Sequence, residues 1–244
     1  MANIDLFTDL LGHWELGLIR TITGQTPGES SAGNVTFIET EAGSRYVLKR
    51  KTGRRTLQHE YRLLETLAAQ GVPVAVPLRT RSGAPYIQAG DDYFDLSPHI
   101  PGTVYNDHYV PGAVDRARQF GAAIARLHAA LRFCEPFISA QDMDLTGDIG
   151  RFIPVVRSLW PACQPSIDPI LAELEAGLAA CFTELPKQLI HRDAHPGNML
   201  FLEGQLSGWL DFEIMLRGPR LFDLCYCSTS LLINGFNDPA KRQA

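Results

Sequence analysis

The chain has 244 residues, of which 45% are hydrophobic and 20% charged, a balance typical of a folded globular protein rather than a disordered one. A formal net charge of −5 argues against a nucleic-acid-binding protein, because such proteins are usually basic. No stretch approaches the roughly eighteen apolar residues of a membrane span, and the first residues lack the basic leader of a signal peptide. The five cysteines show neither metal-binding nor disulfide-type spacing, so we predict a cytoplasmic protein without nucleic-acid or membrane partners.

The amino-terminal part of the chain is predicted to be rich in strands, with one strong helix. Alternating apolar residues bounded by turn residues indicate strands, and leucines that recur every three or four positions indicate the helix. In chain order the expected elements are a short helix over residues 6–14, the strands Leu18–Thr23, Asn34–Thr40 and Arg45–Arg50, the helix Thr52–Gln70, and a hairpin of Ala84–Ala89 and Tyr93–Leu96.

A break in regular structure is predicted at residues 98–102, because Pro98 and Pro101 lack amide donors and Gly102 frees the backbone. We take this segment as a hinge between an amino-terminal lobe, residues 1–97, and a mainly helical carboxy-terminal lobe, residues 103–244. The elements expected in the second lobe are the helices Ala113–Leu131, Gly147–Leu159, Pro169–Phe182 and Leu221–Ile233, and the strands Met199–Leu202 and Gly208–Leu210.

The most informative motif lies between His191 and Asp211, where H-R-D-A-H-P-G-N-M-L-F is followed by G-W-L-D. Asp193 precedes Asn198 by five positions, and Asp211 follows further along the chain. This order suits phosphoryl transfer from a magnesium nucleotide, in which one carboxylate meets the attacking hydroxyl while an amide oxygen and a second carboxylate hold the metal. We predict Asp193 as the catalytic base, and Asn198 and Asp211 as ligands of Mg²⁺.

Lys49 and Glu60 form a second candidate constellation. Strand alternation places Val47 and Lys49 on one face, and Glu60 lies at the edge of a buried helical stripe, where a charge needs a partner. We predict that Lys49 pairs with Glu60 and reaches the α- and β-phosphates of ATP. The alternative is that both side chains are solvated, as most lysines and glutamates are.

The H-x-D-x-x-P-x-N pattern, together with a helix that begins E-Y-R at Glu60 and ends in G-V-P-V, resembles the aminoglycoside phosphotransferase and choline kinase family. This resemblance implies an α+β, two-lobe protein-kinase-like fold: an antiparallel amino-terminal sheet with one main helix, a helical second lobe, and ATP in the cleft between them. It implies an ATP-dependent kinase whose phosphate acceptor is a hydroxyl of a small molecule such as an aminoglycoside, an amino sugar, homoserine or a choline-like compound.

The resemblance also implies roles for further residues. Ser30 and Ser31 belong to a small, flexible loop expected to cover the phosphates, and the backbone of Pro98 and Ile100 is expected to meet the adenine. Asp223 is expected to support the catalytic loop. Members of the family usually continue with further helices after this position, so the chain is either a compact member or a piece of a longer protein.

Some roles stay open at the level of sequence. His191 and Arg192 are expected to brace the loop, and His195 either faces the cleft or fills the turn. For Glu213 we favour a surface position over contact with a second metal or a cationic substrate. Two other functions compete with the small-molecule kinase: a protein Ser/Thr kinase, which the relaxed phosphate loop disfavours, and a nucleotide-binding pseudokinase scaffold.

Overall fold

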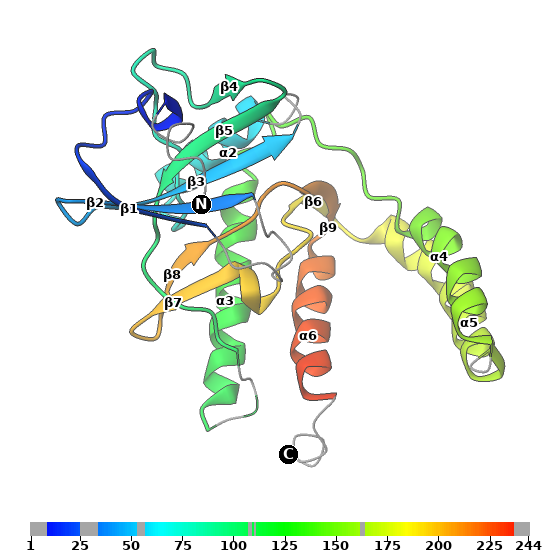
Figure 1. Cartoon of the computed structure of the whole chain (residues 1–244). Coiled ribbons are helices and arrows are strands. Elements are labelled where there is room, and N and C mark those ends of the chain that lie inside the picture. The colour runs from blue at the N-terminus through cyan, green and yellow to red at the C-terminus, as the bar shows by residue number, and fades with distance from the viewer. Residues whose placement is uncertain are drawn as a thin grey trace.

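The computed structural model describes residues 9–24, 34–52, 57–106, 109, 111–161 and 164–236. Within these ranges the chain forms a five-stranded antiparallel sheet followed by a mainly helical part that carries two small two-stranded sheets (Figure 1). This is the α+β class predicted from the sequence. The predicted hinge at residues 98–102 and the lobe boundaries stay predictions.

The two faces of the amino-terminal sheet differ in what they contact. One face is apolar: Ile38, Leu48 and Leu96 lie in a core that the opening segment closes with Leu10 and Trp14. The other face turns toward the second half of the molecule. The strands lie in the order β1 (Ile19–Gly24), β2 (Val35–Thr40), β3 (Arg45–Thr52), β5 (Asp92–Pro98) and β4 (Ile87–Ala89), with helix α2 (Leu57–Ala69) beside them.

Strand β3 is two residues longer than the sequence predicts, and strand β5 is three residues longer. Pairing between them extends from Tyr46 opposite Pro98 to Thr52 opposite Asp92. Cross-strand hydrogen bonds therefore carry β3 past the predicted end at Arg50, and β5 includes Pro98, which the sequence placed in the hinge.

The second half of the molecule is built around α3 and α6, which run side by side below the sheet (Figure 1). Phe120, Ile124, Leu127 and Leu131 recur along one side of α3 and are almost fully buried. The elements are α3 (Ala113–Leu131), α4 (Leu145–Leu159), α5 (Gln164–Glu184), β6 (Lys187–Ile190), β7 (Met199–Leu202), β8 (Gln205–Trp209), β9 (Leu216–Pro219) and α6 (Arg220–Phe236).

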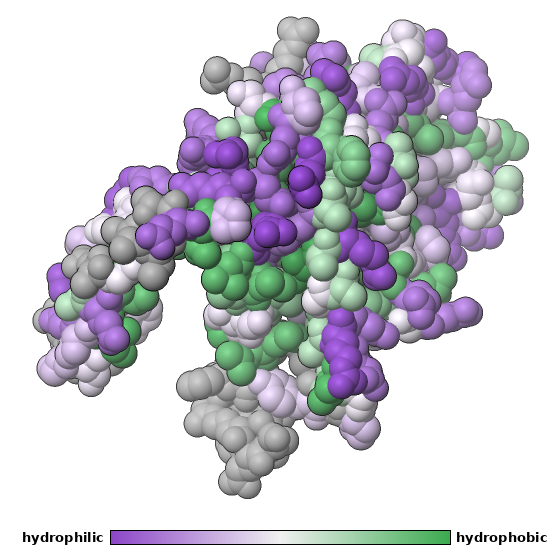
Figure 2. Space-filling view, turned by 180° about the vertical axis from the view of Figure 1, so that it is seen from behind, coloured by the Kyte–Doolittle hydropathy of each residue, from purple (hydrophilic) through white to green (hydrophobic). Residues whose placement is uncertain are grey.

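Helices α4 and α5 pack against each other and project from the body as a hairpin (Figure 1). Large apolar side chains are exposed on this hairpin and on α6, and the view from behind shows hydrophobic atoms on the body beside it (Figure 2). In the described part of the chain, no helix has the length and apolarity needed to cross a bilayer.

Two strands of the second half were not predicted, β6 and β9. Each has only four residues, and they pair with one another across the chain, from Lys187 opposite Pro219 to Ile190 opposite Leu216. Such short strands carry little periodic signal of their own. Their pairing matters for function, because β6 leads directly into the loop that begins at His191.

Gly102 sits where two distant backbones come close. The neighbouring Thr103 exchanges two backbone hydrogen bonds with Phe201, both of 2.9 Å. Gly102 has a φ of +138°, and a Cβ there would overlap Ser207 Oγ and lie 3.0 Å from the Phe201 carbonyl oxygen. This position therefore requires glycine.

We expect Gly102→Ala to lower the free energy of unfolding by about 1–3 kcal/mol, because the added methyl meets backbone in a strained conformation. For a chain of this size that loss corresponds to a fall in Tm of several degrees in a thermal melt. Gly121→Ala is the matched control, since Gly121 lies within α3 and a Cβ there meets nothing within 4 Å. Equal Tm changes for the two variants would contradict the argument.

Candidate active site

A cleft of about 660 Å³ lies between the amino-terminal sheet and the β7–β8 hairpin, and it gathers residues that are far apart in sequence. The predicted catalytic and metal-binding side chains come from the loops after β6 and β8, and the predicted lysine and glutamate come from β3 and α2. The candidate residues that line it are Lys49, Glu60, Pro98, Ile100, Asp193, Asn198 and Asp211.

The loop after β6 holds Asp193 and Asn198 against each other. The Asn198 side-chain amide donates to the Asp193 carbonyl at 2.9 Å and to Asp193 Oδ2 at 2.8 Å. Because its Nδ2 is used in this way, Asn198 turns its carbonyl oxygen away from Asp193. The contact orients the Asp193 carboxylate and leaves the Asn198 oxygen free to bind a cation.

Asp223 anchors this loop through backbone hydrogen bonds. The Asp223 side chain is fully buried at the start of α6 and accepts backbone hydrogen bonds from His191 (2.9 Å) and Arg192 (2.8 Å). Its Oδ2 also lies 2.8 Å from Nε2 of His128, a buried residue of α3. The loop-supporting contacts that the resemblance implied for Asp223 are therefore present, while His128 was not foreseen, although it falls on the buried stripe of α3.

His191 braces the same loop as a neutral imidazole. Its Nε2 donates to the Leu210 carbonyl at 2.9 Å, and its Nδ1 accepts from the Asp193 amide at 3.3 Å. Both ring nitrogens are thus occupied by the tautomer that carries its proton on Nε2. Complete burial lowers the pKa of His191 below the usual histidine value, and this outweighs the opposite effect of Asp223 and the Leu210 carbonyl.

This shift predicts a pH dependence of stability. Because the pKa of His191 is lowered in the folded state, the unfolded chain takes up the proton first as the pH falls. The stability that His191 contributes should be complete above about pH 6.5 and decline below it. In chemical denaturation, the stability advantage of wild type over His191→Gln should shrink between pH 7.5 and pH 5.5; an advantage that is equal at both pH values would contradict the assignment.

The predicted ion pair between Lys49 and Glu60 is wrong, and Lys51 takes the place of Lys49. Lys51 Nζ lies 2.5 Å from Glu60 Oε1 and 3.2 Å from Asp95 Oδ2. Both lysines are on the face of β3 that lines the cleft, as alternation requires. The predicted strand ended at Arg50, so Lys49 was the only lysine in it. Pairing with β5 extends the strand and brings Lys51 next to α2.

Lys51, Glu60 and Asp95 form a buried, charged group that we call the Lys51 cluster. Burial disfavours the charge of Lys51, but Asp95 and Glu60 outweigh it, so the pKa of Lys51 lies above its ordinary value. Burial also raises the pKa of Glu60, and Asp95 and Glu213 add to that effect against the opposing ammonium. We conclude that Lys51 is firmly charged and that three carboxylates compete for it.

The oxygens of Asn198 and Asp211 fit a magnesium ion. Asp211 follows β8 with a φ of 59°, a left-handed conformation that is uncommon for aspartate, and both residues line the cleft. No group of three or more His, Cys, Asp or Glu side chains within the described ranges could hold a metal. Mg²⁺ is usually held by one or two protein ligands together with substrate phosphates and water, so an amide oxygen and one carboxylate suit it.

The sequence of this chain matches the model of the phosphotransferase enzyme family over residues 24–242. The chain is a member of that family. Among its relatives is a homoserine kinase of Methylocella silvestris, 27% identical over 229 residues, which cover 89% of this chain and 66% of that protein. A homoserine kinase of Pseudomonas aeruginosa is 27% identical over 240 residues, which cover 96% of this chain and 72% of the relative. The phosphotransferase chain thus spans about two thirds of the length of such relatives.

Solved structures of small-molecule kinases share the fold of this phosphotransferase. An aminoglycoside phosphotransferase of Alicyclobacillus acidocaldarius superposes with a TM-score of 0.71 at 19% identity, covering 97% of this chain and 74% of that one. An amicoumacin kinase in complex with AMP-PNP and Ca²⁺ has a TM-score of 0.68 at 18% identity, covering 96% and 70%. These likenesses establish the protein-kinase-like fold, and the family and its relatives support a kinase that acts on a hydroxyl group.

The remaining candidate residues of the phosphotransferase have mixed outcomes. Ser30 and Ser31 lie outside the described residues. His195 does both things that the sequence left open: it lines the cleft, and its Nδ1 accepts the Gly197 amide at 3.0 Å within the turn. Glu213 is exposed, as the favoured surface position requires, and it also lines the cleft with its Oε1 3.5 Å from Lys51 Nζ.

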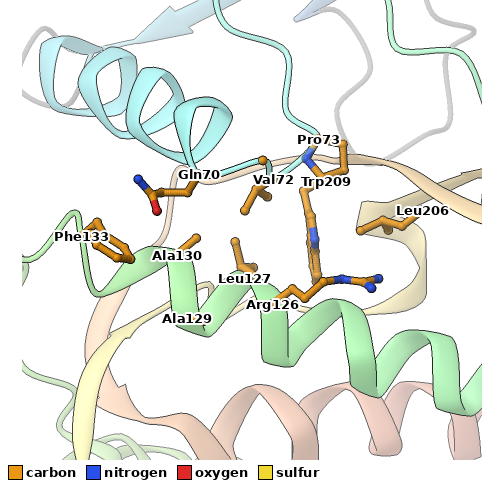
Figure 3. Close-up of a pocket in the computed structure, with 11 residues that line it drawn as sticks. Gln70, Val72, Pro73, Arg126, Leu127, Ala129, Ala130, Phe133, Leu206 and Trp209 are labelled. Carbon is orange, nitrogen blue, oxygen red and sulfur yellow. The ribbon is translucent and has the colours of Figure 1, made fainter.

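A second, smaller cavity of about 250 Å³ lies between the end of α2 and helix α3 (Figure 3). Its lining is mostly apolar, with Val72, Leu127 and Leu206 around the Trp209 ring. Trp209 also lines the main cleft, so the two spaces adjoin at this residue. Asp193, Asn198, Asp211 and both lysines of β3 line the main cleft, which is therefore the candidate active site.

Proposed function

We propose that this chain transfers the γ-phosphate of MgATP to a hydroxyl group of a small molecule in the cleft between its sheet and its helical part. The observation that carries the proposal is the convergence of Asp193, Asn198 and Asp211 on one cleft, on a loop that buried Asp223 anchors through two backbone amides. ATP supplies the phosphoryl group, and Mg²⁺ would neutralise its oxygens. A cytoplasmic location, expected from the cysteine pattern, is part of the proposal.

Each residue has one task in this proposal. The Asp193 carboxylate, oriented by Asn198, accepts the hydrogen bond of the acceptor hydroxyl and takes up its proton as transfer proceeds. Asn198 and Asp211 hold the metal ion. The backbone of Pro98 and Ile100 meets the adenine.

Three further residues serve the nucleotide in this proposal. Ser30 and Ser31 cover the phosphates, and Glu60 maintains the charged side of the cleft.

Homoserine is the first acceptor to test, because relatives of this chain are named homoserine kinases. Aminoglycosides, amino sugars and choline-like compounds follow, since the fold is shared with kinases of antibiotics. A protein Ser/Thr kinase is the weaker alternative. A pseudokinase scaffold is disfavoured because the candidate base and both metal-ligand candidates are present and lie together.

A coupled ADP-release assay with MgATP across these acceptors and a generic protein substrate tests the proposal. We expect acceptor-dependent ADP production with one class of small hydroxyl compound and none with the protein. ADP production that depends only on the protein substrate would replace the proposal with a protein kinase. MgATP binding without turnover on any acceptor would favour the scaffold.

A further inference from the structure

Tyr226 lies on α6 beside the loop that carries the predicted base. It follows Asp223 by three positions, so the two side chains lie on the same side of the helix. Asp223 accepts the backbone amides of His191 and Arg192. The side of α6 that anchors the loop therefore also presents Tyr226 to the next residue of the loop, Asp193.

Two aromatic contacts hold the Tyr226 ring. It stacks on Phe222, one helical turn earlier, with ring centroids 6.0 Å apart and planes at 14°. Phe222 in turn packs against the buried cluster that contains Ile190, the last residue of β6. Tyr226 also meets His195 in an edge-type arrangement, with centroids 6.3 Å apart and planes at 66°. The ring is thus in contact with both its own helix and the loop.

The Tyr226 hydroxyl reaches the Asp193 carboxylate. Burial raises the pKa of Tyr226 above its ordinary value, and a hydrogen bond to Asp193 and the charge of that carboxylate raise it further, against the opposite effect of Arg192. An ionised carboxylate only accepts hydrogen bonds, so the phenol is the donor. His195, whose ring touches Tyr226, has its Nε2 3.6 Å from Asp193 Oδ2, which places the same aromatic pair beside the carboxylate.

A single hydrogen bond does not fix the orientation of a carboxylate. The last torsion of an aspartate side chain is broad, so its oxygens can rotate unless other groups hold them. Asn198 donates to Asp193 Oδ2 at 2.8 Å from within the loop, and Tyr226 adds a second donor from α6. Two donors from separate elements restrict this rotation and keep the carboxylate in the geometry that a base needs.

We propose that Tyr226 is a positioning residue for phosphoryl transfer, which orients the Asp193 carboxylate toward the acceptor hydroxyl. The inference rests on the proposed kinase function and adds to it a residue outside the motif between His191 and Asp211. The acceptor oxygen forms its bond to the γ-phosphorus while the bond from that phosphorus to the β–γ bridging oxygen breaks and ADP leaves. The hydroxyl proton passes to Asp193, and Tyr226 keeps its own proton throughout.

Tyr226→Phe removes the hydroxyl and keeps the ring. We expect kcat to fall about tenfold, because a small misplacement of a catalytic group costs up to about a hundredfold. The acceptor KM and the dissociation constant of MgATP should stay within about twofold of wild type, which is the signature of a loss confined to the transition state. Tm should be nearly unchanged, since 38% of Tyr226 is exposed.

Tyr109→Phe is the matched control, because the Tyr109 hydroxyl donates to the Leu231 carbonyl further along the same helix. This variant should keep the kcat of wild type. Wild-type or higher kcat in Tyr226→Phe, or an equal fall in both variants, would overturn the inference. A raised acceptor KM with unchanged kcat would also overturn it, because Tyr226 would then contact the substrate rather than the base.

A double variant tests whether Tyr226 acts through Asp193. Residues that act as one unit have non-additive effects on rate. In the Asp193→Asn background, Tyr226→Phe should therefore lower the residual kcat by less than about twofold. A second tenfold loss in the double variant would mean that Tyr226 acts independently of Asp193, and would overturn the inference.

A spectroscopic measurement separates the contact from kinase activity. Protein labelled with 3-fluorotyrosine gives a fluorine NMR resonance for Tyr226, identified by its loss in Tyr226→Phe. We expect Asp193→Asn to move this resonance and to leave that of Tyr109 in place. An unmoved Tyr226 resonance would overturn the inference and leave the kinase proposal intact. A moved resonance in a protein that phosphorylates none of the acceptors would overturn the kinase proposal, and the positioning role with it, while the contact stands.

Discussion

Asp193→Asn is expected to reduce the rate of phosphoryl transfer by about a hundredfold to ten-thousandfold, the usual contribution of a positioned general base. The amide has the shape of the carboxylate but cannot take up the proton of the acceptor hydroxyl. The loop should keep its conformation, because Asn198 also donates to the Asp193 main-chain carbonyl and Asp223 holds the amides of His191 and Arg192.

The decisive measurement compares turnover with nucleotide binding. We expect kcat to collapse while the dissociation constant of MgATP, measured by calorimetry, stays within about twofold of wild type. Asp142→Asn is a matched control, since Asp142 is exposed and forms an ion pair with Arg217 at the surface. Wild-type turnover by Asp193→Asn would exclude Asp193 as the base. A parallel loss of nucleotide affinity would instead indicate that the substitution disturbs the metal site.

Asp223→Asn is expected to cost both stability and activity. Asp223 accepts two backbone amides and lies against His128, with no exposure to solvent. An asparagine presents one amide group in place of a carboxylate oxygen, so a buried N–H donor would face another donor. Hydrogen bonds to charged groups are worth about 1.5–3 kcal/mol each, so we expect a loss of about 2–4 kcal/mol in the free energy of unfolding.

The same substitution should lower kcat, because the anchored amides belong to the two residues that precede Asp193. Thermal melts and turnover of Asp223→Asn should be compared with Asp115→Asn, an exposed aspartate that pairs with Arg118 on α3. A variant with wild-type Tm and wild-type kcat would mean that Asp223 does not support the loop. A stable variant with reduced kcat would place its role in the geometry of the loop alone.

Much of the architecture follows from local sequence patterns. Period-two alternation located β1, β2 and β3, and it placed Val47 and Lys49 on one face, which is the face that lines the cleft. Apolar residues at helical spacing located α2 and α3. The motif that contains Asp193 and Asn198 is also local, since a turn of a few residues brings the two side chains into contact. Local signals of this kind depend on neighbouring residues and need no knowledge of the fold.

Other features depend on contacts between distant parts of the chain. Strands β6 and β9 have four residues each, and only their pairing with one another makes them strands. His128 and Asp223 are 95 positions apart, and no local pattern in either segment predicts their contact. The residues of β3 likewise do not predict the cross-strand hydrogen bonds with β5 that extend the strand.

The sequence by itself determined the helix that carries Glu60 and the order of the base and the metal-ligand candidates, because both depend on spacing along the chain, and the resemblance of its motifs to a known family implied the fold class. The tertiary structure decided which lysine meets Glu60 and brought Glu213 into the same cluster. Those two outcomes depend on where β3 ends against β5 and on how the loop after β8 crosses the cleft. Long-range pairing sets both, and local spacing cannot encode them.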